Sequence, residues 1–395
     1  MFAIAILVYS GLNLHIVGRK LGKEVRQMFK NQTIDTSSLE EVMLENIPGK
    51  ISLVETYGLI QKVLQKKDYN NFEYVKDNDG YLNYASFYRE DTINVFTCAE
   101  RVKKLKDYIE PYGTKLIFVI APSKFNKDSK NRSDMPISDP TQNIIELEVY
   151  LRRLGVDVIN LSSEFPNSEL TYDESFFKTD HHWTIPAAFM ATGMLVEEMK
   201  KTGGPDLDPT GYYTNPDAYD SKTYYGNMLG AMGRDTGIIY SGLEDFTAYF
   251  PKYDSNFTRT YMERDEDKIV NTGSFENVLM DKEVLQDKID YYTDSQYSLY
   301  MDQVRDIDLI INNDNPDGPS IGMIRDSYFA PVIAFMAPMC SRIDALYSLE
   351  KIDDLDITSY IKEQYRTGKG YDYFIVEYYP FNIEEASFRF FRGDN

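Results

Sequence analysis

Histidine, tryptophan and cysteine are scarce in this chain, and each scarcity limits the chemistry open to it. The 395 residues include three histidines, one tryptophan and two cysteines. With so few histidines, a proton shuttle that works near neutral pH has few places to lie. Cys98 and Cys340 lack the CxxC spacing of a cysteine-based zinc site, which excludes such a site; whether they pair as a disulfide stays open.

Positive charge is also in short supply. The formal net charge is -21, which argues against nucleic-acid binding because the phosphate backbone would be repelled. The sequence has no GxGxxG motif, no P-loop and no internal repeat. Its length suits two average domains or one large α/β domain with an insertion. The acidic surface fits a neutral or cationic partner, or is simply well solvated.

The N-terminal run Phe2–Val17 is apolar and is followed by a basic stretch that starts at Arg19. The run is shorter than the roughly 20 residues of a spanning helix and lacks the basic start of a secretory signal. We expect residues 1–17 to be the end of a truncated membrane anchor, with a buried N-terminal helix as the alternative. Residues 18–76 are expected to be a helical connector, and 77–395 the main domain.

Helical periodicity and short apolar runs alternate along the main domain. The expected helices are Cys98–Ile109, Thr141–Leu154, Ile185–Lys200 and Ile357–Tyr365, and the expected strands are Lys115–Ala121, Val156–Leu161, Ser320–Ile324, Arg342–Leu349 and Tyr373–Tyr378. Strands that are apolar on both faces and alternate with helices predict a three-layer αβα sandwich around a mostly parallel sheet.

The range 206–302 interrupts this alternation. It is rich in Tyr, Asp, Asn and Gly, and nine tyrosines fall between Tyr212 and Tyr261. A structureless stretch of this length is unusual in a compact domain. We therefore expect an insertion of short strands that lies over the functional site and turns some of its tyrosines toward it.

His181 and His182 stand together beside Trp183, the only tryptophan. Asp180, two residues before His182, is able to take the Nδ1 proton and leave Nε2 free as a base. A capped turn before the helix at Ile185 explains the aspartate but not the paired histidines, so chemistry is favoured. A metal site is disfavoured, because adjacent histidines on an extended strand point to opposite faces.

Ser327 comes directly after the expected strand Ser320–Ile324. Ligands collect at the carboxyl ends of parallel strands, and a tight turn there exposes the serine Oγ beside main-chain N–H groups. Taken alone, Asp326-Ser327 fits a helix cap better than a catalytic site. Because Asp180 and His182 are expected in the same sheet and a serine needs a base, the nucleophile interpretation is favoured.

These residues resemble the DHHW family, whose members are SGNH-hydrolase-like relatives of the alginate O-acetyltransferases. Asp180-His181-His182-Trp183 matches the four-residue signature, and the resemblance extends from about Asp77 to the C-terminus. Supporting segments are 120–124, 240–246, 251–253 and 324–328. The resemblance implies an SGNH-hydrolase-like fold in which Asp180 orients His182, His182 is the base and Ser327 is the nucleophile.

The chain departs from the family pattern at two places. Arg325 stands where a glycine usually precedes Asp-Ser, and no Gly-x-Asn-Asp block completes the oxyanion hole. Phe381 replaces the arginine of a Glu…Arg-Asn pattern. The resemblance implies these residues for the oxyanion hole or for substrate binding: Ser327, Lys124, His181, Tyr328 and Asn382.

The function that the resemblance implies is an extracytoplasmic, membrane-associated O-acetyltransferase of a polysaccharide or cell-envelope glycan. Ser327 would take an acetyl group from a membrane-bound O-acyltransferase and pass it to a sugar hydroxyl, with neither metal nor cofactor. Two alternatives stay open: a carbohydrate esterase with the same three residues, and a non-catalytic carbohydrate-binding protein of the cell surface. The tyrosine-rich range and the absent oxyanion block favour the non-catalytic alternative.

Overall fold

The computed structural model describes residues 26, 47–85, 92–124, 140–165, 170–262, 269–285, 289–302, 305–348 and 356–392. The chain divides into two compact units, residues 1–66 with 235–241 and residues 67–234 with 242–395. The expected anchor, residues 1–17, lies outside the described residues. Within the described ranges, every helix is too short or too polar to cross a membrane.

In the first unit, helix α3 (Lys50–Val63) packs against the short helix α10 (Ile238–Ser241). Helix α3 begins after Gly49, whose φ of 75° lies in the left-handed region that glycine adopts without strain. Gly58 permits the close packing, because a Cβ there would lie 2.6 Å from a main-chain oxygen of residue 236. The Glu55 carboxylate accepts hydrogen bonds from two main-chain N–H groups of α10, at 2.9 and 3.0 Å.

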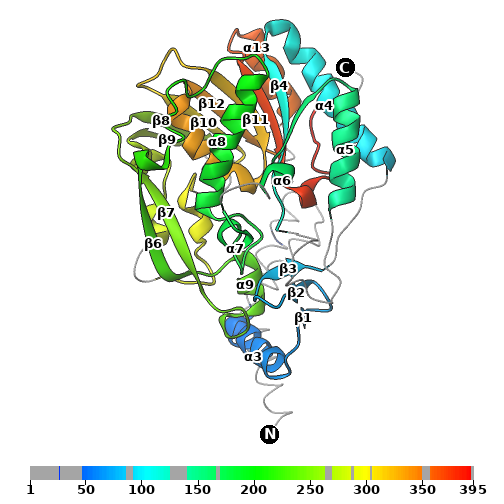
Figure 1. Ribbon diagram of the computed structural model, residues 1–395, viewed down its shortest axis with the longest axis vertical. Coiled ribbons are helices and arrows are strands. Elements are labelled where there is room, and N and C mark those ends of the chain that lie inside the picture. The colour runs from blue at the N-terminus through cyan, green and yellow to red at the C-terminus, as the bar shows by residue number, and fades with distance from the viewer. Residues whose placement is uncertain are drawn as a thin grey trace. The chain divides into compact units, whose positions relative to one another are not determined.

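The second unit is built on an eight-stranded sheet with the order β5-β4-β13-β11-β12-β10-β8-β9 (Figure 1). The first five strands are parallel, and the last three continue the sheet in antiparallel fashion. The strands are β4 (Lys115–Ile120), β5 (Asp157–Asn160), β8 (Phe257–Met262), β9 (Ile269–Gly273), β10 (Ile307–Asn312), β11 (Ser320–Arg325), β12 (Arg342–Tyr347) and β13 (Tyr373–Tyr378).

Two hydrophobic cores lie on opposite faces of this sheet. Alternate residues of β4 divide between them: Ile117 and Val119 join one core, and Leu116, Phe118 and Ile120 the other. The first core also contains α8 (Ile185–Lys201) and α12 (Ala330–Met336). The second contains α4 (Thr92–Ile109), α5 (Thr141–Arg153) and α13 (Ile357–Arg366). The predicted αβα sandwich with a mostly parallel sheet is confirmed.

A separate three-stranded antiparallel sheet precedes the main one. It consists of β1 (Asp68–Tyr69), β2 (Tyr74–Lys76) and β3 (Leu82–Tyr84). Strands β2 and β3 form a hairpin whose turn contains Asn78, Asp79 and Gly80. The prediction of a helical connector over 18–76 is wrong at its C-terminal end, because β1 and β2 are strands. Asn70 and Asn71 have φ values of 48° and 55°, a left-handed turn that asparagine tolerates better than most residues.

The range 206–302 forms short strands, as expected, but in two places. Strands β6 (Tyr219–Met228) and β7 (Glu244–Pro251) make a two-stranded sheet, whereas β8 and β9 extend the central sheet. Five of the nine tyrosines between Tyr212 and Tyr261 pack together with Phe189 and Phe335 in an aromatic cluster: Tyr212, Tyr213, Tyr219, Tyr249 and Tyr253. Most of these tyrosines therefore contribute to the core.

The two cysteines are free thiols, which answers the open question of a disulfide. Cys98 lies in the core beneath α4 and α5, and Cys340 lies in the core on the other face of the sheet. Both are fully buried, with at most 1% of their surface exposed. The sheet itself separates the two sulfur atoms.

Candidate active site

The candidate site lies at the carboxyl ends of three adjacent parallel strands, β4, β13 and β11. Ser327 follows β11 after one residue, and Tyr379 follows β13 directly. Lys124 lies four residues beyond the end of β4. Parallel strands bring the segments that follow them to the same edge, so residues more than 200 positions apart meet here.

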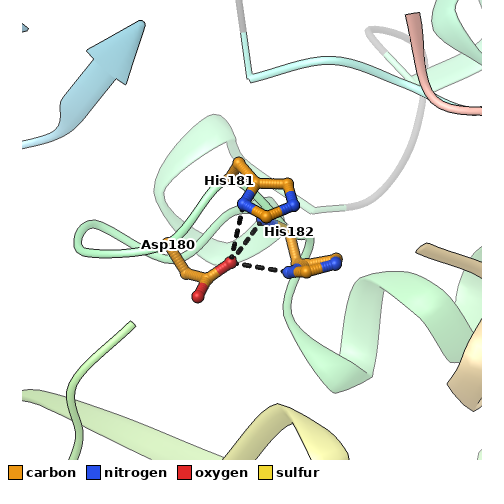
Figure 2. A group of neighbouring side chains, drawn as sticks. All are labelled: Asp180, His181 and His182. Carbon is orange, nitrogen blue, oxygen red and sulfur yellow. Dashed lines mark hydrogen bonds and ion pairs between the residues drawn. The ribbon is translucent and has the colours of Figure 1, made fainter. Parts of the chain in front are cut away.

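Asp180, His182 and Ser327 form a continuous chain of side-chain hydrogen bonds. His182 Nδ1 lies 2.6 Å from Asp180 Oδ1 (Figure 2). On the other side of the ring, His182 Nε2 lies 3.0 Å from Ser327 Oγ. Burial raises the pKa of the Asp180 carboxyl, but its contacts with His182 and His181 outweigh burial and hold the pKa well below the ordinary value. An ionised Asp180 fixes the His182 tautomer that carries its proton on Nδ1. Its Nε2 is then a free acceptor for the Ser327 hydroxyl proton.

The loop that carries Asp180 is held from several sides. Asp180 Oδ2 accepts from the main-chain N–H of Ala231 at 2.7 Å. The Glu244 carboxylate accepts from the main-chain N–H groups of residues 178 and 179, at 2.6 and 2.7 Å. Gly230 packs so closely that a Cβ there would lie 2.3 Å from the Asp180 Cβ. Any larger residue at Gly230 would displace the carboxylate.

Lys124 belongs to this support and not to the oxyanion hole. Its Nζ donates to the main-chain oxygens of Leu82, Lys178 and Asp180 at 2.7, 3.0 and 2.8 Å. Burial lowers the pKa of Lys124 to about 8, and the three acceptors match the three N–H bonds of the charged ammonium. The substrate-binding role expected for Lys124 is therefore corrected, because its donors are already used within the fold.

Aromatic rings fix the orientation of His182. The Tyr297 ring stacks on the His182 ring with 3.8 Å between centroids, and the Tyr297 hydroxyl donates to the Tyr328 main-chain oxygen at 2.8 Å. Trp183 Nε1 donates to the same oxygen at 3.1 Å and to the Tyr297 hydroxyl at 3.0 Å. The tryptophan of the signature thereby joins the histidine loop to the serine turn.

The turn that carries Ser327 is set by Asp326. Asp326 Oδ1 accepts from the Tyr328 N–H at 2.8 Å, and Oδ2 accepts from the Tyr379 N–H and from Asn382 Nδ2, each at 2.7 Å. Asn382 therefore helps to position the turn that carries Ser327. Ser327 is half-buried, and within the described part of the chain its main-chain N–H has no acceptor. That N–H is free to bind an oxyanion.

Glu377 lies at the end of β13 beneath this turn and is fully buried. Its Oε2 accepts from the Asp326 main-chain N–H at 3.2 Å. Burial raises the pKa of the Glu377 carboxyl well above the ordinary value, and the nearby Asp326 carboxylate adds to the shift. Burial therefore favours the protonated form of Glu377 in the folded protein.

We expect Glu377→Gln to be more stable than the native protein at about pH 8 and to lose this advantage toward about pH 4.5. The folded chain keeps the Glu377 proton that the unfolded chain releases above its ordinary pKa of 4.5. The unfolded state binds fewer protons, so native stability falls as the pH rises, whereas glutamine has no proton to release. Thermal melting of both proteins across this range measures the difference. A difference that does not change with pH contradicts a protonated Glu377.

His181 and His182 lie on the same side of their loop. Their ring centroids are 3.9 Å apart, so the expectation that they point to opposite faces is wrong. The segment is a series of bends and not an extended strand. Ligand atoms of Asp180, His181 and His182 lie within 4.8 Å of one another, close enough to hold a cation. The hydrogen bond between Asp180 Oδ1 and His182 Nδ1 already occupies one of the candidate ligand atoms of each residue.

Sequence reasoning grouped Asp180, His182 and Ser327, and the structure brings them together. His181 lies beside them with 21% of its side chain exposed. The Tyr328 ring is buried, and its hydroxyl donates to the His181 main-chain oxygen at 3.2 Å. Tyr297 and Glu244 were not singled out, because their contacts join segments more than 60 residues apart and leave no local pattern. Tyr297 belongs to the range 206–302, some of whose tyrosines were expected to face the site, but it lies outside the group between Tyr212 and Tyr261.

Comparison with known families supports the resemblance read from the sequence. Residues 79–255 match the ALGX family, described as the SGNH hydrolase-like domain of acetyltransferase AlgX. The matched range contains Asp180, His181 and His182 and ends before Ser327. The resemblance is confirmed over these residues, which are similar to the SGNH hydrolase-like domain of that family. No protein of curated function matches the sequence.

Solved structures share the fold at low sequence identity. PatB1 of Bacillus cereus is 16% identical with a TM-score of 0.64, and its structure with a sulfonyl adduct is 17% identical with a TM-score of 0.63. Each match covers 80% of this chain and 99% of PatB1. A DHHW family protein from Eubacterium siraeum DSM 15702 is 18% identical with a TM-score of 0.56, over 80% of this chain and 93% of that protein.

Proposed function

We propose that this chain is an extracytoplasmic O-acetyltransferase that acts on a polysaccharide or cell-envelope glycan through an acetyl-serine at Ser327. The observation that carries the proposal is the chain of hydrogen bonds from Asp180 through His182 to Ser327, at 2.6 and 3.0 Å. The match to an acetyltransferase domain supports acetyl as the transferred group. The expected donor is a membrane-bound O-acyltransferase, and the expected N-terminal anchor would keep the chain beside it.

In the first half of the reaction, His182 Nε2 takes the hydroxyl proton of Ser327 as Oγ attacks the carbonyl carbon of the donor acetyl group. The main-chain N–H of Ser327 donates to the oxyanion that forms. Collapse of this intermediate breaks the bond to the donor, and the departing oxygen takes the proton from His182. The ionised Asp180 stabilises the imidazolium between the two transfers.

In the second half, a sugar hydroxyl replaces the donor. His182 Nε2 takes the proton of that hydroxyl, the sugar oxygen attacks the ester carbonyl, and the bond to Ser327 Oγ breaks. The Ser327 oxygen then regains its proton from His182, which restores the starting state. A carbohydrate esterase differs only in that water takes the place of the sugar. A non-catalytic carbohydrate-binding protein would not form the ester at all.

The test is covalent labelling of Ser327. We expect the purified protein, incubated with p-nitrophenyl acetate, to carry one acetyl group on the peptide that contains Ser327, as read by mass spectrometry. A sulfonyl fluoride should label the same residue, since Oγ is able to displace fluoride from sulfur. Ser327→Ala should abolish both labels. Acetyl transfer to an added oligosaccharide, against release of free acetate, separates a transferase from an esterase.

The matched control is Ser341→Ala. Ser341 is also half-buried, but it precedes β12 at the amino end of the strand and has no histidine contact among the described residues. This variant should label like the native protein. A native protein that stays unlabelled, or a label that persists in Ser327→Ala, would overturn the acetyl-serine mechanism.

A further inference from the structure

Four aromatic rings form a closed group beside the catalytic base. Tyr84 lies 5.4 Å from Phe381 and 6.1 Å from His181, measured between ring centroids. Tyr379 lies 5.3 Å from Phe381 and 5.7 Å from His181. The rings come from the end of β3, from the Asp180 loop and from the segment after β13. We call this group the aromatic platform.

The platform reaches both solvent and the reacting atoms. Tyr84, His181 and Phe381 are half-buried, whereas Tyr379 is buried and supports them. The His181 ring stands 3.9 Å from the His182 ring, whose Nε2 contacts Ser327 Oγ. A molecule that contacts the exposed parts of these three rings therefore borders the place where an acceptor hydroxyl must meet His182.

We infer that the aromatic platform is the acceptor subsite and that it binds a neutral pyranose ring of the glycan; this inference rests on the proposed function. One face of a pyranose presents several C–H bonds, which are apolar and carry slight positive charge. Aromatic faces carry slight negative charge, so the two surfaces attract each other while both lose contact with water. A sugar held in this way keeps its hydroxyl groups at its rim, where His182 reaches one of them.

Charge selects against an acidic sugar at this place. Asp180 is ionised a short distance from the platform, and the chain carries a formal net charge of -21. Burial, and then the neighbouring His182, lower the pKa of His181 to about 3, so His181 stays neutral at working pH. Two cations act on His181. The Lys124 ammonium is buried and bound to three main-chain oxygens, and the half-buried Arg234 guanidinium donates from Nη1 to the Leu229 main-chain oxygen at 3.1 Å. A uronate carboxylate would meet repulsion that a neutral sugar avoids.

Binding is tested without the reaction, in the Ser327→Ala protein. We expect titration calorimetry to show that a neutral glucan hexasaccharide binds at least about tenfold more tightly than an oligogalacturonate of equal length. Adding Phe381→Leu should weaken binding of the neutral hexasaccharide by about tenfold, because leucine keeps apolar volume but has no aromatic face. Tyr84→Leu is the second variant, used if thermal melting shows that the Phe381 variant does not fold.

The matched control is Tyr225→Leu, also in the Ser327→Ala protein. Tyr225 is a tyrosine of β6 with 83% of its surface exposed, and its replacement should not change the affinity. Tighter binding of the uronate, or an affinity that neither platform variant lowers, overturns the inference. Because these measurements need no acetyl-serine, they stand even if Ser327 never labels. If it labels, the neutral hexasaccharide should speed loss of the acetyl group and the uronate should not.

Discussion

His182→Ala should lower the rate at which Ser327 is acetylated by about four orders of magnitude. The serine then loses the base that lies 3.0 Å from its Oγ, and no other described histidine contacts it. The main-chain N–H of Ser327 still binds the oxyanion, so a small residual rate survives. Stopped-flow release of p-nitrophenol from p-nitrophenyl acetate measures the acetylation step directly.

Two neighbouring variants make this expectation specific. Asp180→Asn should lose about three to four orders of magnitude, because an amide no longer selects the His182 tautomer or stabilises the imidazolium. His181→Gln is the matched control, since His181 neighbours both residues but takes no part in proton transfer; its acetylation rate should fall far less. Equal losses from the His181 and His182 variants, restored by added metal ion, would contradict the mechanism and indicate a metal site at Asp180.

Asp308→Ala should destabilise the fold by about 3 to 5 kcal/mol, the largest stability effect that we expect from a single substitution. The Asp308 carboxylate lies in β10 and pairs with Arg259 of β8 at 2.7 Å and with Arg325 of β11 at 3.1 Å. All three side chains are at most 2% exposed. Removing the carboxylate leaves two buried guanidinium groups without their shared anion. Urea unfolding, followed by circular dichroism, measures the loss.

The control for charge alone is Asp317→Ala, which removes an exposed carboxylate from the loop before β11. It should change stability by less than about 0.5 kcal/mol. If Asp308→Ala does not fold, the triple variant Arg259→Met, Asp308→Leu and Arg325→Met is measured as well. It should fold, because apolar packing replaces all three charges and leaves none of them unpaired. A small effect of Asp308→Ala, similar to that of Asp317→Ala, would show that water reaches the two arginines.

The central strands were predictable because a strand that is buried on both faces is a continuous apolar run in the sequence. Strand β13 has the predicted bounds, Tyr373–Tyr378, and helix α8 differs from its prediction by one residue. Strand β10 was not predicted, because Asp308 interrupts its apolar run. The partners that make this aspartate tolerable lie 49 and 17 residues away in the sequence. The sequence alone does not explain such a buried charge, because only folding brings the opposite charges next to it.

The same distinction holds at the site. Asp180 and His182 are two positions apart, so their relation is visible in the sequence. Ser327 was reached through the rule that parallel strands end at a common edge. Lys124 was assigned to the oxyanion hole or the substrate through the resemblance, because the sequence does not show its three main-chain acceptors. Tyr297, which stacks on His182, lies 115 positions from it and belongs to no motif.

The position of the single tryptophan gives this protein a built-in optical probe. Trp183 is fully buried, and its indole ring lies 4.8 Å from the ring of Tyr328, the residue that follows Ser327. Its Nε1 donates to the main-chain oxygen of Tyr328, so its emission depends on the polarity and geometry of the serine turn. When the protein is excited at wavelengths that only indole absorbs, the emission of Trp183 therefore reports changes at Ser327 without any label. No tyrosine contributes to this emission.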